Sequence, residues 1–155
     1  MANMKPRDWL HLEESLPHQL RRATQTWTAH WQQRVPDLTS PQFAILLVLR
    51  ERDGLDQSEL GARTAIDRST LTPLLDRMDA RGLVTKAPDP ANRRRRIITL
   101  TETGRHRLAQ AIVEATRLHE GLEDVFGTDD LRRLVELLRM LGDMPPADTS
   151  APPAG

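Results

Sequence analysis

The feature that most constrains this chain is a run of four arginines, residues 93–96, at the tip of a predicted β-hairpin. The run follows a cluster of turn-forming residues, Pro88, Asp89, Pro90 and Asn92. That cluster separates the short segment 83–86 from residues 96–100, where β-branched residues and alternating polarity favour a strand. The arginines therefore fall in the connecting loop or at the start of the returning strand, where they are free to reach a phosphate group.

Three interpretations of the arginine run are open. A charge run of this kind can be a solvated surface feature, or a loop that meets an acidic protein partner. However, four like charges within one turn repel one another unless an anion is nearby, which favours contact with nucleic acid.

The charge of the chain is unevenly distributed, although its formal net charge is zero. Residues 81–107 hold eight basic and two acidic side chains, whereas residues 108–148 hold four basic and nine acidic ones. A chain with one positive end can bind DNA there, while its acidic remainder keeps it soluble and orients the encounter.

Composition excludes several classes of protein. The chain has no cysteine, which removes disulfides, thiolate zinc sites and thiol-based sensing. It has no glycine-rich phosphate loop and no spaced His-carboxylate motif, so we expect neither an enzyme nor a bound cofactor. His11, His18 and His30 lack a carboxylate cluster that would make a metal site. Without a secretory signal or a membrane span, the chain is expected to be cytoplasmic and to have no membrane partner.

Start signals and hydrophobic periodicity predict a helix-turn-helix before the hairpin. A capping box formed by Asp56 and Glu59 begins one short helix, and Asp67 caps the next. Gly82 supplies the left-handed residue that ends this second helix. Its apolar residues follow at i, i+3, i+4 and i+7, and they are Leu71, Leu74, Leu75 and Met78. Together with the basic hairpin, the pair predicts a winged helix-turn-helix whose second helix enters the major groove.

Further helices flank this region. Ser15 with Pro17 begins a helix that lasts until Pro36, and Thr39 begins another. After the hairpin, Thr101 is expected to cap a long helix, and Thr128 a final one. The apolar stripes of the first and last two helices are too long for one small lobe to cover, which predicts an obligate homodimer.

The predicted fold class is therefore mainly α with a small β-hairpin wing, a winged helix-turn-helix with N- and C-terminal dimerisation helices. We assign residues 8–36 to the N-terminal dimerisation helix and residues 37–101 to the DNA-binding region. Residues 102–143 form the C-terminal dimerisation helices, and residues 144–155 are a disordered tail by composition.

Four pieces of the chain, in this order and spacing, resemble the MarR (multiple antibiotic resistance regulator) family of bacterial transcription factors. The pieces lie at residues 38–44, 67–72, 81–84 and 89–104. The resemblance implies a homodimer that reads a pseudo-palindromic operator in double-stranded DNA. It also implies which residues meet DNA. Those at the major groove are Arg68, Ser69, Thr70, Thr72 and Arg77, and those on the wing are Arg93, Arg94 and Arg95.

One position departs from the family pattern. The family commonly has an acid immediately before the arginine that matches Arg93, and here that residue is Asn92. Asparagine can still hydrogen-bond and hold the turn, but it loses an ion pair. We count Asn92 among the candidate DNA-interface residues, with a wing that is more mobile or more dependent on DNA for its order.

The first helix suggests an effector site. Residues 16–23, followed by Trp27 and Trp31, look like the family's regulators of aromatic-acid catabolism. In those regulators an arginine on this helix meets a small aromatic carboxylic acid. A guanidinium pairs with a carboxylate in two places, and an indole offers a flat wall for a ring. The candidate ligand-binding residues are Arg21, Arg22, Trp27, Trp31 and His18.

Two alternatives to this sequence-based interpretation stay open. The two tryptophans, four residues apart, are also consistent with packing in the dimer core, and the two arginines are consistent with solvated charges. The alternative for the whole chain is a non-enzymatic helical protein-interaction module whose basic loop binds an acidic partner.

Overall fold

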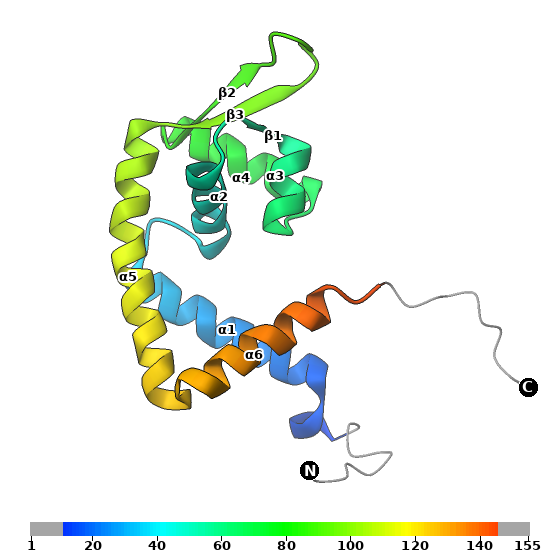
Figure 1. Cartoon of the computed structure of the whole chain (residues 1–155), viewed down its shortest axis with the longest axis vertical. Coiled ribbons are helices and arrows are strands. Elements are labelled where there is room, and N and C mark those ends of the chain that lie inside the picture. The colour runs from blue at the N-terminus through cyan, green and yellow to red at the C-terminus, as the bar shows by residue number, and fades with distance from the viewer. Residues whose placement is uncertain (1–10, 146–155) are drawn as a thin grey trace, which may run out of the picture. The chain divides into compact units, whose positions relative to one another are not determined.

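The structure, a computed structural model, describes residues 11–145 and is largely helical, with one small antiparallel sheet (Figure 1). The elements, in chain order, are a 3-10 helix (Leu12–Glu14), α1 (Leu16–Arg34), α2 (Ser40–Glu51), β1 (Leu55–Asp56), α3 (Gln57–Thr64), α4 (Arg68–Ala80), β2 (Val84–Pro88), β3 (Arg96–Leu100), α5 (Glu102–Phe126) and α6 (Thr128–Gly142). The predicted mainly α fold class with a hairpin wing is confirmed. Most of the predicted tail, residues 146–155, lies outside the described residues, as do residues 8–10 of the predicted first helix.

The chain divides into two compact units, residues 1–116 and residues 117–155. The first contains α1 to α4, the sheet and the start of α5, and the second contains the end of α5 and α6. The candidate DNA-binding residues all belong to the first unit.

The helix starts show why the local sequence folds as it does. A capping box at Asp56 begins α3: its Oδ1 accepts from the Glu59 N–H at 2.8 Å, and its own N–H donates to Glu59 Oε2 at 3.2 Å. Thr39 and Gln42 form a second such box at α2. The prediction for α6 was wrong in detail, because Gly127, not Thr128, is its N-cap, with a φ of 77° that suits glycine.

The sheet has the strand order β1-β3-β2, with both pairs antiparallel. The hairpin strands β2 and β3 match the prediction. Strand β1 was not predicted, because it is only two residues long. Ile98 in the central strand is opposite Leu55 on one side and Lys86 on the other, and it is fully buried. Strand β1 therefore joins the returning strand of the hairpin directly to the start of α3.

The core of the first unit is built from aliphatic side chains. Its fully buried members come from α2, α3, α4, the sheet and α5, and include Ile45, Leu46, Leu49, Leu60, Leu71, Leu75, Met78, Ile98 and Leu108. The four apolar residues predicted for α4 are all buried. Because they hold one side of α4 against the core, the opposite polar face is left exposed.

The start of α5 packs tightly on the turn between α4 and β2. The Thr101 hydroxyl donates to the Gly82 carbonyl at 2.6 Å and accepts from the Gly104 N–H at 2.9 Å. A Cβ on Gly104 would overlap the Leu83 carbonyl oxygen and lie 2.8 Å from Leu100 Cδ1. Glycine at 104 is thus required for the close approach that sets the hairpin after α4.

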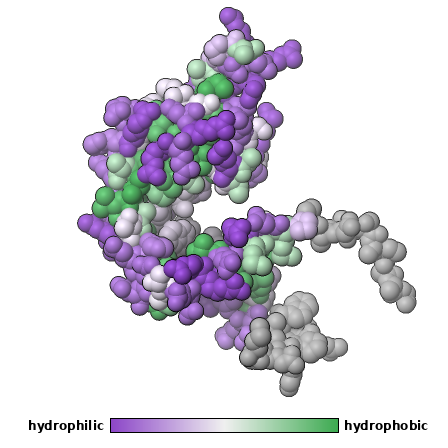
Figure 2. Space-filling view, viewed as in Figure 1, coloured by the Kyte–Doolittle hydropathy of each residue, from purple (hydrophilic) through white to green (hydrophobic). Residues whose placement is uncertain are grey.

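The second unit carries apolar residues at its surface. Leu131 is buried, whereas other large apolar side chains of the unit are exposed, and they include Val125, Phe126, Leu134, Val135, Leu137, Leu138 and Met140. Figure 2 shows hydrophobic residues at the surface over α6. Among the described residues, none of the helices combines the length and apolar character needed to cross a membrane.

Candidate nucleic-acid interface

The start of α4 is held by the carboxylate of Asp67. Its Oδ1 accepts from the Thr70 N–H at 2.9 Å and from the Ser69 hydroxyl, and its Oδ2 accepts from the Thr70 hydroxyl at 2.8 Å. These hydrogen bonds, with that from Ser69 the largest cause, lower the pKa of Asp67 from 3.8 to about 2. Ser69 and Thr70, predicted at the major groove, therefore donate their hydroxyl protons to Asp67, the residue that caps the helix.

The exposed face of α4 presents two arginines. In the described part of the chain, the guanidinium groups of Arg68 and Arg77 make no ion pair. Thr72 lies one turn after Arg68, and its hydroxyl donates to the Arg68 carbonyl at 3.0 Å and accepts from the Gln57 side chain. Gln57, the first residue of α3, is a member of this surface that sequence reasoning missed. Its place directly after the Asp56 cap was the available signal.

The wing turn is closed by hydrogen bonds of its own residues. The Asp89 N–H donates to the Arg95 carbonyl at 3.0 Å, and the Asn92 N–H donates to the Asp89 carbonyl at 3.2 Å. The Asn92 side-chain oxygen accepts from the Arg94 N–H at 3.2 Å. Asparagine therefore holds the turn at the position where the family pattern has an acid.

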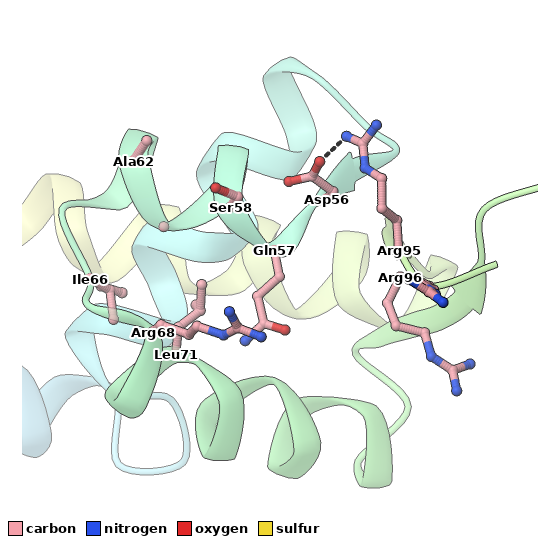
Figure 3. A pocket seen from close by; sticks show the side chains of 11 residues that line it. Asp56, Gln57, Ser58, Ala62, Ile66, Arg68, Leu71, Arg95 and Arg96 are labelled. Carbon is pink, nitrogen blue, oxygen red and sulfur yellow. Dashed lines mark hydrogen bonds and ion pairs between the residues drawn. The ribbon is translucent and has the colours of Figure 1, made fainter. Parts of the chain in front are cut away.

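The four arginines of the wing differ in their surroundings. Arg93, Arg94 and Arg96 are exposed, and none of their guanidinium groups makes an ion pair within residues 11–145. Arg95 instead pairs with the carboxylate of Asp56, although it was predicted as a DNA contact like its neighbours. In Figure 3 the Arg95 side chain points to Asp56, whereas Arg96 points away from it.

A pocket of about 570 Å³ lies between α3, the start of α4 and the wing. Basic side chains from both sides line it: Arg68 from α4, and Arg94, Arg95 and Arg96 from the wing. Ser58 and Gln57 add polar groups from α3 (Figure 3). A concave surface with several cations and few acids is suited to an anion, and the phosphate backbone of a nucleic acid is the anion that this chain's charge pattern indicates.

The candidate effector residues on α1 differ in their burial and in their contacts. Trp31 is buried with 4% of its surface exposed, and its ring centroid lies 4.8 Å from that of Phe43, with the two ring planes tilted by 50°. Trp27 is partly exposed, and its ring centroid lies 6.0 Å from that of Trp31. Arg21 Nη2 lies 3.0 Å from His18 Nδ1, and Arg21 is exposed whereas His18 is half-buried.

Arg22, the remaining effector candidate, donates to the side-chain oxygen of Gln19 at 3.5 Å.

Among the residues that the structure describes, no group of three or more histidine and carboxylate side chains lies close enough together to hold a metal ion.

Comparison with known proteins places the chain among DNA-binding regulators. A sequence model of the MarR family matches residues 37–95. The transcriptional regulator HosA of Escherichia coli O111:H- is 36% identical over 124 residues, which are 80% of this chain and 92% of HosA.

Two solved structures share the fold. The transcriptional repressor CouR, bound to a 23-mer DNA duplex, has a TM-score of 0.79 at 31% identity, covering 88% of this chain and 96% of that one. BpsR of Bordetella bronchiseptica, whose DNA binding is regulated by 6-hydroxynicotinic acid, has a TM-score of 0.82 at 32% identity. That match covers 87% of this chain and 98% of BpsR.

Proposed function

We propose, from the premise that this chain belongs to the MarR family of transcriptional regulators, that it is a homodimeric repressor. It binds a pseudo-palindromic operator through two winged lobes and leaves that operator when a small aromatic carboxylate binds. As a member of this family the chain is not an enzyme.

The observation that carries the proposal is the group of unpaired arginines on one surface. Arg68 on α4 and Arg94 and Arg96 on the wing line the same pocket, and within the described residues none of them is neutralised by a carboxylate. Exposed cations held close together repel one another, so an approaching phosphate backbone lowers their energy. In this arrangement α4 reads bases in the major groove, while the wing contacts phosphates or the minor groove.

The test is a fluorescence-anisotropy titration of the full chain with labelled DNA from the promoter region beside its own reading frame. We expect binding that weakens steeply as salt rises from about 50 to 200 mM, because neutralised phosphates release counterions. Two half-sites about one helical turn apart are needed for full affinity. DNA binding that is absent or independent of salt overturns the proposal and favours a protein-interaction module.

The dimer rests on the exposed apolar residues of α1 and α6. Leu134 and Leu138 are 41% and 45% exposed although they lie on one stripe of α6, and Leu16 on α1 is exposed as well. A second copy of the chain is the partner that would remove such stripes from water. Analytical ultracentrifugation at micromolar concentration is expected to show a dimer, and a folded monomer contradicts this part of the proposal.

The effector rests on α1. Arg21 offers a guanidinium beside His18, and Trp27 offers a partly exposed indole two turns further along the helix. The indole N–H of Trp31 already donates to the Leu38 carbonyl, so we expect Trp31 to pack against Trp27 rather than to contact the ligand. BpsR, a regulator of the same fold, responds to an aromatic carboxylic acid.

Isothermal titration tests the effector with benzoate-, salicylate- and nicotinate-type acids. Arg21→Ala and Arg22→Ala are compared with Gln32→Ala, an exposed residue on the same helix. We expect one acid to bind the wild type and the Gln32 variant equally, and at least one arginine variant less tightly. Release of DNA requires that the acid bind the free dimer more tightly than the DNA-bound one. No binding by any acid, or binding that both arginine variants leave unchanged, contradicts the effector while leaving DNA binding intact.

A further inference from the structure

One arginine of the wing is placed unlike the other three. Arg95 pairs through Nη2 with Asp56 Oδ2, and the same nitrogen lies 3.9 Å from Glu59 Oε2. Its other terminal nitrogen lies 4.0 Å from Asp89 Oδ2. We refer to these four residues as the Arg95 cluster. They bring together side chains that are up to 39 residues apart in the sequence.

The Asp56 carboxylate divides its two oxygens between two tasks. Oδ1 accepts from the Glu59 N–H at 2.8 Å and so caps α3, while Oδ2 receives Arg95. Only 11% of the Asp56 side chain is exposed, so a carboxylate there depends on a nearby positive charge. Arg95 is the cation that supplies it.

On the wing side, the cluster includes the residue that begins the turn. Asp89 Oδ1 accepts from the Ala91 N–H at 2.8 Å, while Oδ2 faces Arg95. A single guanidinium therefore joins the turn of the hairpin to the cap of α3. If Arg95 left this position to contact DNA, the buried Asp56 would lose its partner, and three carboxylates would face the incoming phosphates.

We propose that Arg95 is a positioning residue that fixes the wing against the start of α3, and that Arg93, Arg94 and Arg96 are the arginines available to DNA. The second half of this statement rests on the proposed DNA-binding function, whereas the first half concerns the free protein alone. Lys86, which pairs with Asp76 of α4, adds a second ion pair between the hairpin and the helix-turn-helix.

The free protein offers a direct test, because the chain has no cysteine and Ala91 at the wing tip is exposed. A nitroxide attached to Ala91→Cys reports wing mobility by electron paramagnetic resonance without DNA. We expect Arg95→Gln to increase the mobility of the label at least twofold. Asp56→Asn should do the same, because asparagine keeps the cap of α3 but removes the charge. The matched control is Arg94→Gln, which removes an unpaired arginine and should leave mobility unchanged.

Combining Arg95→Gln with Asp56→Asn should add little beyond Arg95→Gln alone, because either change breaks the pair between Arg95 and Asp56. Circular dichroism of each variant verifies that the helices are retained. If the label is equally mobile in the wild type, Arg95→Gln and Asp56→Asn, the positioning role is wrong whatever happens with DNA.

The DNA arm separates positioning from contact. Arg94→Gln should lower the slope of log K against log salt by about one for each phosphate that the wing no longer neutralises. Arg95→Gln should weaken binding with the slope unchanged, since the wild-type side chain neutralises Asp56 rather than a phosphate. A slope reduction for Arg95→Gln equal to that for Arg94→Gln overturns the proposed division among the arginines. Failure of the wild type to bind DNA defeats the proposed function but leaves the mobility result to decide the positioning role.

Discussion

The indole N–H of Trp31 donates a hydrogen bond to the backbone carbonyl of Leu38 at 2.6 Å, and both residues are buried. The bond joins α1 to the segment that leads into α2, across the break made by Pro36. A tilted ring contact with Phe43 joins α1 to α2 itself. Trp31 is therefore a core residue of the first unit, which separates its role from that of Trp27.

Trp31→Phe should lower the free energy of unfolding by about 1–3 kcal/mol, because the Leu38 carbonyl stays buried without a donor. Trp27→Phe is the control, since this residue is partly exposed and no hydrogen bond of its indole is present among the described residues. Urea titration followed by circular dichroism measures both. Equal stability of the two variants would show that the Trp31 hydrogen bond contributes nothing.

Two glycines of α5 make a matched pair. Gly104→Ala should destabilise the protein by about 3 kcal/mol or more, because the added Cβ meets the Leu83 carbonyl and Leu100 with no room to move. Gly121→Ala places the same group in open space within the same helix, and should stabilise it by about 1 kcal/mol. Thermal unfolding of the two variants is the measurement. Effects of the same sign would contradict the close approach at Gly104.

Most of the fold follows from local sequence signals. The starts of α2, α3 and α4 depend on residues within four positions of one another, such as Asp67 and Thr70, and the strands β2 and β3 follow from the residue pattern of a single hairpin. Strand β1 was missed because two residues are too few to show periodicity. Its pairing partners, Ile97 and Ile98, are also far from it in the sequence. The α6 cap was assigned to Thr128 because threonine is a common cap, whereas Gly127 takes a backbone conformation that glycine favours.

The sequence predicted where the residues of the candidate interface lie, but not which side chains they contact. Sequence placed Arg68 and Arg94 on the helix and the wing, and the structure has them line one pocket. Nothing in the sequence distinguished Arg95 from the neighbouring arginines. Its partner Asp56 is 39 residues away in the chain and was already explained as the cap of α3. Whether these residues contact DNA stays a prediction.

Changing Leu134 and Leu138 together to glutamate should dissociate the proposed dimer at micromolar concentration. Two charges would then occupy the apolar stripe of α6, where burial against a partner strongly disfavours them. Glu136→Gln on the same helix affects only an exposed ion pair with Arg133, and it should leave the dimer intact. Sedimentation velocity distinguishes the species. A dimer that persists in the double variant places the interface elsewhere.

Asp67 should make stability depend on pH in the acid range. Its pKa is about 2 in the folded protein and near 3.8 when unpaired, so the unfolded chain takes up the proton first as pH falls. The stabilisation is complete above about pH 4 and is lost as pH falls through about 2. Asp67→Asn retains a cap acceptor without this titration, so it should lose less stability than the wild type between pH 5 and 2.5. Parallel urea midpoints across that range test the sign, and identical pH profiles would contradict it.

Arg68 should determine base preference, in contrast to the wing arginines. It lies at the first position of α4, unpaired within the described residues and on the exposed face, where a guanidinium can bond two acceptors of a guanine. Arg68→Ala should therefore compress the affinity differences among single-base variants of the operator by about 1–3 kcal/mol at one position in each half-site. Arg94→Ala should weaken all operator variants by the same factor, because a phosphate contact carries no sequence information. A competition series over the operator variants, performed at one salt concentration, measures both patterns. If the two substitutions gave the same pattern, α4 and the wing would not divide specificity and affinity between them.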